Sequence, residues 1–195
     1  MKINLKMLAV AAVGLSVSVL SAKTCTWIAS TGNWTDETNW QDGAVPEDGD
    51  DVVFQNPNND GGVISLEGGT TAKLASLTAK EGSGWNIQDG TLALMPGEWV
   101  TDNNVTVKIE ANLASAGNVI LVKRGSGTLS LSGANPVTTQ FVVEGGRLQP
   151  ENVGAYGPVP ESYKVDAIIL RNGAALADVL GSDGKARFLY EIVRK

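Results

Sequence analysis

The stretch that decides the fold runs from Leu121 to Leu148, and reads LVKRGSGTLSLSGAN over 121–135 and FVVEGGRL over 141–148. Inside it, the segment 128–132 alternates hydroxyl and aliphatic side chains. This period of two predicts a strand with Leu129 and Leu131 on the buried side, and with hydroxyl groups such as that of Ser130 facing water. Glycines on both sides of the segment mark sharp changes of chain direction.

A shorter phrase, glycine-x-leucine, recurs along the chain. Its glycines and leucines are Gly90 and Leu92, Gly127 and Leu129, and Gly146 and Leu148. The separation from Leu92 to Leu129 is close to twice that from Leu129 to Leu148, which gives a common step of roughly 19–20 residues. Such a step is the length of one coil of a parallel β-solenoid, in which a corner glycine precedes an inward leucine. In a chain with 23 glycines, the triplet also arises by chance.

Working outward, the chain from Asp51 onward shows short β-favouring runs separated by glycine, asparagine and aspartate. The runs cover 52–54, 63–66, 74–79, 85–87, 91–94, 105–109, 119–122, 128–132, 140–143, 165–170 and 188–193. One helix is considered over 174–180, with Asn172 as its cap and Gly181 at its end. Strands at this spacing also suit a β-sandwich, but a sandwich has no reason to contain the long phrase at 121–148.

That long phrase resembles the autotransporter-associated β-strand repeat. The family pattern is approximately leucine, lysine, glycine-x-glycine-threonine-leucine, leucine-serine-glycine-x-asparagine, then valine and glycine-glycine-x-leucine. Residues 121–148 match nearly every position and depart from it only at 136–139, where the family carries a glycine-rich turn. The resemblance implies an all-β fold, namely a short right-handed parallel β-helix secreted or displayed as a passenger. It implies no catalytic residues, because stacking positions alone define the repeat.

The flanks of the phrase extend the resemblance to roughly 27–172. The opening GNW…TNW…GDD is similar to the start of many such secreted proteins, and 152–170 is similar to the segment after their repeats. We therefore expect four parts: a signal peptide at 1–22, a Trp-rich N-terminal cap at 23–60, solenoid repeats at 61–172 and a closing segment at 173–195. Because no outer-membrane barrel comes after them, we expect a free-standing module or a shortened relative.

Residues 1–22 have the pattern of a secretory signal peptide. Lys2 and Lys6 precede an uncharged apolar stretch over 7–20, and the small residues Ser21 and Ala22 come next. The stretch is too short for a membrane span, which needs about 20 apolar residues, so the mature chain should have no transmembrane segment. An uncleaved anchor is the alternative. We expect an exported bacterial protein, located outside the cell, at its surface or in the periplasm.

Composition excludes several kinds of function. Loss of Lys2 and Lys6 with the signal takes the net charge from −6 to −8, which argues against nucleic acid as a partner. The chain contains no histidine, which removes Ser-His-Asp and Cys-His catalysis and the commonest zinc ligand. Cys25 is the only cysteine, so no internal disulfide can form.

Three tryptophans, Trp27, Trp34 and Trp40, lie within fourteen residues and have two interpretations. They could stack on sugar rings as a ligand-binding platform, or they could close the N-terminal end of the solenoid. Each tryptophan buries about 150–250 Å². A short solenoid must cover its first coil, so we favour the cap.

Acidic residues suggest two further sites. Asp48, Asp50 and Asp51 lie in a loop-forming run with many oxygen ligands of the kind that calcium prefers, although Gly-Asp-Asp is also ordinary turn chemistry. Glu110, Glu144 and Glu151 could be acids on adjacent coils of a polysaccharide hydrolase or lyase, but the sequence does not place them on one face.

The sequence as a whole therefore favours a secreted or cell-surface structural module that is adhesin-like and not an enzyme, with no cofactor apart from the calcium alternative. Its expected partners are extracellular polysaccharide or a protein of a host or cell surface. The alternative is a carbohydrate-binding module, or a β-helix of the polysaccharide lyase or hydrolase type.

Overall fold

A computed structural model describes residues 22–58, 60–135, 139–157, 164–177 and 190–194 of the 195-residue chain. Apart from Ala22, the predicted signal peptide lies outside the described residues. No helix in the described part of the chain has the length and apolar character needed to cross a bilayer.

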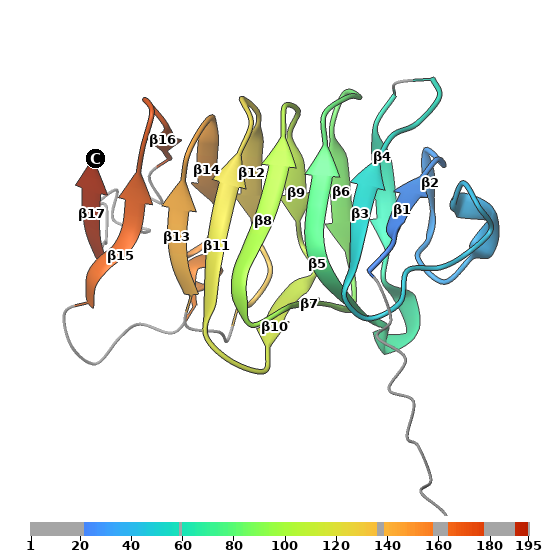
Figure 1. Cartoon of the computed structure of the whole chain (residues 1–195), viewed down its shortest axis with the longest axis horizontal. Helices are drawn as coiled ribbons and strands as arrows, with labels where there is room; N and C mark the ends of the chain where they lie inside the picture. Colours follow the sequence, from blue (N-terminus) through green and yellow to red (C-terminus); the bar gives the residue numbers. More distant parts are fainter. Residues whose placement is uncertain (1–21, 59, 136–138, 158–163, 178–189, 195) are drawn as a thin grey trace, which may run out of the picture.

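Two parallel sheets face each other, and the chain passes from one to the other along the length of the molecule (Figure 1). The main path of the first sheet, sheet A, contains β1 (Thr24–Trp27), β3 (Asp50–Phe54), β5 (Thr71–Ala79), β8 (Gly97–Asn103), β11 (Val119–Arg124), β13 (Thr139–Val143), β15 (Lys164–Leu170) and β17 (Tyr190–Arg194). The second sheet, sheet B, contains β2 (Thr31–Asn33), β4 (Gly62–Ser65), β6 (Trp85–Gln88), β9 (Val107–Ile109), β12 (Thr128–Leu131), β14 (Arg147–Pro150) and β16 (Ala175–Leu176). Each strand pairs with the strand of the next coil, so the predicted all-β parallel solenoid is confirmed.

A third, shorter ladder branches from sheet A at one corner of the solenoid (Figure 1). The first half of β5 pairs with β7 (Thr91–Leu94), which in turn pairs with β10 (Asn112–Ser115). The second half of β5 pairs with β8, so β5 turns a corner within one strand. Three short 3-10 helices complete the described elements: η1 (Glu37–Asn39), η2 (Glu67–Gly69) and η3 (Val153–Tyr156).

The predicted coil length holds in the stretch 121–148 but not along the whole solenoid. In that stretch, Leu121 of β11 pairs with Phe141 of β13, and Leu129 of β12 pairs with Leu148 of β14. The next coil is longer, since Phe141 pairs with Ile168 of β15, and β1 and β3 are offset by the same longer step. Loops at the corners absorb the extra residues without disturbing the stacked strands.

The leucines of the three glycine-x-leucine phrases lie in two different columns of stacked side chains, not in one. Leu148 lies directly over Leu129 in sheet B, as predicted. Leu92, however, is in β7 and pairs with Ala72 and Leu113 in the corner ladder, while Val107 is the residue directly below Leu129. The spacing from Leu92 to Leu129 is therefore coincidental, because the two leucines belong to different ladders.

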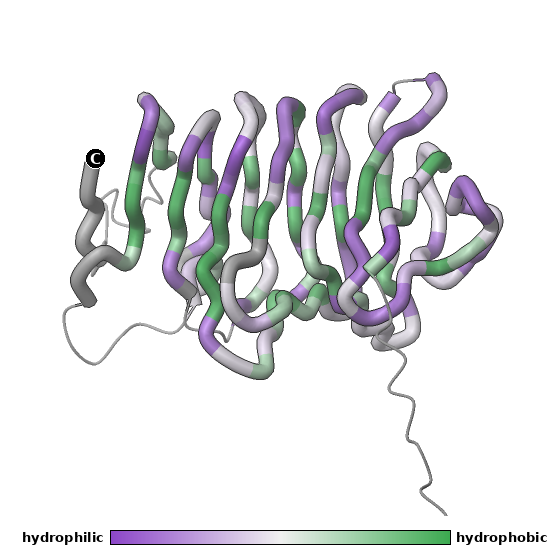
Figure 2. The backbone as a smooth tube through the Cα atoms, in the orientation of Figure 1, coloured by the Kyte–Doolittle hydropathy of each residue, from purple (hydrophilic) through white to green (hydrophobic). Residues whose placement is uncertain are grey.

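The core is built from columns of inward side chains that stack along the solenoid axis. In sheet B, Ile64, Ile87, Ile109 and Leu131 follow one another in register, and all are buried. Figure 2 shows the corresponding apolar segments on successive strands. Burial of each such side chain contributes about 1.5–3 kcal/mol, so repetition of the column along the axis is the main source of stability.

The alternation across β12 is confirmed for the leucines, but the prediction that Ser130 faces water is wrong. Leu129, Leu131 and Leu148 are each 0% exposed in one continuous core. Ser130 does point to the outer side of the strand, yet it is only 3% exposed. Its hydroxyl donates a 2.6 Å hydrogen bond to Oε1 of Glu151 on the next coil, and the longer side chain covers it.

Glycines occupy corners where one coil touches the coil below. A Cβ atom at Gly127 would overlap the carbonyl oxygen of Val105, and one at Gly146 would overlap that of Gly127. Gly146 also has φ +63°, in the left-handed region that glycine adopts without strain. The predicted role of glycine at tight corners is therefore confirmed at both positions.

The predicted helix over 174–180 is wrong for 174–177, and 178–180 lie outside the described residues. Asn172 has φ +52° and Gly173 φ +73°, so these two residues form a turn instead of a helix cap. The chain then enters β16, in which Ala175 pairs with Arg147 and Leu176 with Leu148. The open ladder edge of the preceding coil overrides the helical preference of this alanine-rich segment.

The ladder extends beyond 61–172 in both directions. β1 and β3 of the Trp-rich segment already belong to sheet A, and β16 continues sheet B. The final run, predicted at 188–193, forms β17, which pairs in parallel with β15 as the last strand of sheet A. Residues 188 and 189 lie outside the described residues.

We predict that Leu131→Asp lowers the free energy of unfolding by more than about 3 kcal/mol, because it buries an unpaired carboxylate inside the column. Thr128→Asp is the matched control on the outer side of the same strand, where Thr128 is only partly buried and lies beside Arg147. It should cost less than about 1 kcal/mol. Chemical denaturation of both variants measures the difference, and equal losses would contradict the assigned strand orientation.

Candidate functional site

All three predicted tryptophans are buried. Trp27 is 0%, Trp34 3% and Trp40 2% exposed. The indole N–H of Trp27 donates to the carbonyl oxygen of Ala29 at 2.7 Å, and that of Trp40 donates to the carbonyl oxygen of Trp34 at 2.9 Å. The rings of Trp27 and Trp40 meet edge to face at 5.2 Å between centroids, as do those of Trp34 and Trp40 at 4.8 Å.

This cluster lies at the N-terminal end of the solenoid, where the segment with η1 folds beside β1 and β2 (Figure 1). The backbone of that segment also closes the free edge of β1, since Ile28 N–H donates to Asn39 O and Gln41 N–H to Thr26 O, both at 2.9 Å. A sugar platform built from these tryptophans would need at least two open indole faces. In this arrangement the tryptophans are packed against each other, which fits a contribution to the end of the core.

The three predicted calcium ligands point to different partners. Asp48 is exposed and pairs with Lys73 at 2.9 Å, whereas the carboxylate of Asp51 accepts a hydrogen bond from Ser76. Asp50 and Asp51 are neighbours on β3 and so project to opposite faces. Among the described residues, no three histidine, cysteine, aspartate or glutamate side chains lie close enough to hold a metal ion. Calcium binding therefore stays a prediction without a ligand cluster to support it.

Asp50 instead ties the N-terminal coil together. Its buried carboxylate accepts hydrogen bonds from the backbone N–H groups of Lys23, at 2.9 Å, and Glu47, at 2.8 Å. Burial by itself would raise the pKa of Asp50, but these donors and the nearby Lys23 ammonium outweigh it and lower that pKa. Cys25 Sγ lies 3.6 Å from the same carboxylate, and burial followed by this negative charge raises the pKa of the thiol.

The three candidate glutamates divide between two places. Glu144 lies between Arg124 on the coil below and Arg171 on the coil above, at 3.0 and 2.9 Å. Hydrogen bonds from both arginines lower its pKa, the one from Arg124 most strongly, despite partial desolvation. Glu110 and Glu151, in contrast, occupy one column on the outer face of sheet B with Ser132 between them.

That outer face carries an ordered array of polar side chains, which we call the polar face of sheet B. Outward residues of four successive coils form its columns: Thr106, Thr128 and Arg147; Asn86, Lys108, Ser130 and Gln149; and Gln88, Glu110, Ser132 and Glu151. Successive coils are separated by about 4.8 Å, so the columns repeat with that spacing.

Hydrogen bonds link the charged members of this face. Lys108 pairs with Glu110 at 2.6 Å, and Asn86 donates to Glu110 at 3.1 Å. These two bonds lower the pKa of Glu110, and the same pairing raises the pKa of Lys108. Hydrogen bonds from Ser130 and then Gln149 lower the pKa of Glu151. Both carboxylates are therefore ionised at neutral pH.

Two acceptors on the polar face lack a donor. The side-chain Oδ1 of Asn86 and Oγ of Ser132 are buried atoms with no hydrogen-bond partner. Leaving a buried polar atom unpaired costs about 1–3 kcal/mol, so a new hydrogen bond to either atom would be favourable once a movement of neighbouring side chains exposes it.

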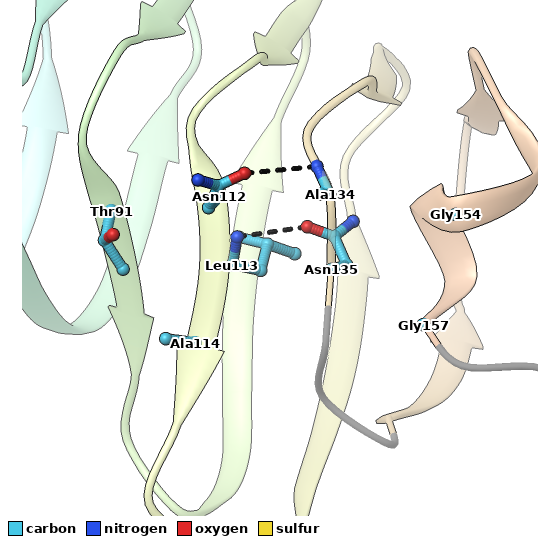
Figure 3. A pocket seen from close by; sticks show the side chains of 8 residues that line it. All are labelled: Thr91, Asn112, Leu113, Ala114, Ala134, Asn135, Gly154 and Gly157. Carbon is cyan, nitrogen blue, oxygen red and sulfur yellow. Dashed lines mark hydrogen bonds between the residues drawn. The ribbon is translucent and has the colours of Figure 1, made fainter.

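A shallow groove of about 540 Å³ lies at the corner where the third ladder ends (Figure 3). Thr91 and Asn112–Ala114 line one side, and Asn135 and Gly154 line the other. Asn135 accepts from Leu113 N–H at 3.0 Å and donates to Ala155 O at 2.6 Å, so its amide replaces ladder hydrogen bonds between three coils. Figure 3 marks two bonds between neighbouring coils, from Leu113 N–H to Asn135 Oδ1 and from Ala134 N–H to Asn112 Oδ1.

The interior contains one lysine that sequence reasoning missed. Lys123 lies between the inward positions of Thr101 and Val143 and is 0% exposed. Its ammonium donates to the carbonyl oxygens of Arg124, Gly125 and Gly145 at 2.5, 2.9 and 3.3 Å. Side chains alternate between the two faces of a strand, so the inward position of Leu121 predicts that Lys123, two residues later, also points inward.

The architecture defines a class of protein, the parallel β-solenoids. Beyond that class, the chain matches no protein-family model, no curated protein and no solved structure.

We predict that Trp34→Ala lowers the free energy of unfolding by about 3–5 kcal/mol, as large-to-small core substitutions do. Thr35→Ala, at the exposed neighbouring position, should change it by less than about 0.5 kcal/mol. Thermal or urea unfolding gives both values. A Trp34→Ala variant of normal stability that had lost affinity for a polysaccharide would contradict the packed-cluster interpretation.

Lys123 should make stability depend on pH. Burial lowers its pKa from 10.5 to about 8, so between pH 8 and 10.5 the unfolded chain binds more protons than the folded chain. Stability should therefore rise with pH in this window, by at most about 1.4 kcal/mol per pH unit. Lys123→Met removes this contribution.

Unfolding curves of both proteins at pH 7, 8, 9 and 10 should show the natural protein gaining stability relative to the variant above pH 8. An unchanged difference across the series would exclude a lowered pKa at Lys123.

Proposed function

We propose that this protein is an exported, non-catalytic solenoid that acts as an adhesin-like structural module at the cell surface. The observation that carries the proposal is the coincidence between the repeat phrase at 121–148 and a coil of the predicted length. In that segment, Leu121 stacks with Phe141 and Leu129 with Leu148, each in unbroken register. The lysine, glycine, leucine and asparagine positions of the phrase are the ones that make contacts between coils.

The signal-like segment at 1–22 supports export. The net negative charge of the chain supports a partner other than nucleic acid. A passenger of the autotransporter type would use the solenoid as a stiff, extended scaffold. Each coil adds about 4.8 Å of length, and its outer side chains can vary while the inward columns maintain the fold.

An alternative is a glycoside hydrolase on the polar face, because Glu110 and Glu151 lie two coils apart. Two rungs separate their backbones by about 10 Å, close to the upper end of the carboxyl separation in inverting enzymes. Inversion, however, needs one carboxyl group that keeps its proton, and the pKa values of both glutamates are lowered. This favours binding over hydrolysis.

Export is tested by expressing the chain in its native host with an epitope tag at the C-terminus. We expect the tagged protein outside the cytoplasm, sensitive to protease added to whole cells, with a mature N-terminus near Lys23. Leu15→Arg, which breaks the apolar stretch of the signal, should retain it inside the cell. A soluble cytoplasmic form that keeps Met1 would contradict the proposal.

A further inference from the structure

We propose that the polar face of sheet B binds a neutral, hydroxyl-rich polysaccharide. The inference rests on the proposed function, because an exported protein is the one that meets such polymers. It goes further by assigning a ligand class to one face of the solenoid.

The three columns of the face present amide, hydroxyl, carboxylate and ammonium groups at regular intervals along the axis. These groups come from strands β6, β9, β12 and β14, whose register is continuous, and from the residues directly beside the strand ends. An extended polysaccharide also presents hydroxyl groups at regular intervals, so it can form a polar contact with each successive coil.

The balance of charge on the polar face favours a neutral ligand. On this face, Lys108 and Arg147 balance Glu110 and Glu151, so the face itself is close to neutral. Without the signal segment the chain carries a formal charge of −8, which repels acidic polymers at longer range. A neutral polymer with many hydroxyl groups meets no repulsion and can bond both to the ionised carboxylates and to the amides.

Two buried polar atoms of the face, Asn86 Oδ1 and Ser132 Oγ, have no hydrogen-bond partner. They lie one coil to either side of Glu110 along the axis, in neighbouring columns. Both atoms are buried, so hydroxyl groups of a ligand reach them only when neighbouring side chains of the face move. The carboxylate oxygens of Glu151 and Glu110 accept further hydroxyl donors.

The composition of the face also distinguishes a polysaccharide from a protein partner. Energetic hot spots of protein interfaces are dominated by tryptophan, tyrosine and arginine in dry, packed surroundings. In the columns from Asn86 to Glu151, the outward residues include one arginine and neither aromatic nor large aliphatic side chains. A wet interface formed by many hydrogen bonds suits this face better.

The experiment compares two identical substitutions on opposite faces of the solenoid. Gln149→Ala removes an amide from the polar face, whereas Gln140→Ala removes one from β13 of sheet A. Secreted natural protein and both variants are run by affinity electrophoresis in gels containing galactomannan, xyloglucan or alginate. Thermal unfolding establishes that the variants are folded.

We expect both neutral polymers, or one of them, to retard the natural protein, while alginate does not. Gln149→Ala should weaken this binding about fivefold, as loss of one hydrogen bond does, and Gln140→Ala should change it less than twofold. Three results would overturn the inference: no retardation by either neutral polymer, retardation by alginate as strong as that by the neutral polymers, or equal losses in the two variants. Each of these leaves the export result, and with it the proposed function, standing.

Discussion

The structure depends on one constraint: every inward side chain must pack on the inward side chain of the coil below it. In a parallel ladder, strands lie about 4.8 Å apart, so a mismatch in one coil is transmitted to its two neighbours. The column of Ile64, Ile87, Ile109 and Leu131 satisfies this constraint with side chains of similar volume. Corner loops of different length are tolerated because they lie outside the columns.

Polar side chains inside the solenoid satisfy backbone groups where the ladders are interrupted. The Lys123 ammonium donates hydrogen bonds to three carbonyl oxygens at a corner, and the Asn135 side chain links three coils beside the groove. Asn103 likewise donates to Val105 O and Thr128 O, at 2.7 and 2.9 Å. Buried polar groups of this kind stabilise a fold only when they are paired, so each of them specifies one position of one coil against the next.

Outward side chains do not have to stack in the core, so their chemistry can vary from coil to coil and can be adapted to a ligand. The ion pairs of Glu144 with Arg124 and Arg171 join three coils at an edge and contribute to the scaffold. The polar face of sheet B differs from the surroundings of Glu144 in three ways. Its polar side chains form regular columns, its charges balance, and two of its buried polar atoms have no hydrogen-bond partner. Hydrogen bonds lower the pKa values of Glu110 and Glu151, so both carboxylates are ionised at neutral pH and accept hydrogen bonds.

The sequence by itself determined the class of fold, because alternation at 128–132 and glycines at 127 and 146 are local consequences of a strand that turns a tight corner. The sequence was also sufficient to place Lys123 on the inward side of its strand, because it lies two residues after the inward Leu121. It did not determine which coils are neighbours: Leu92 lies in another ladder, the helix predicted over 174–180 is replaced by β16 where the chain is described, and Ser130 is covered by Glu151. Only the tertiary structure placed Glu110 and Glu151 in one column and packed the tryptophans together, since coil length varies along the solenoid and the register depends on contacts between distant segments.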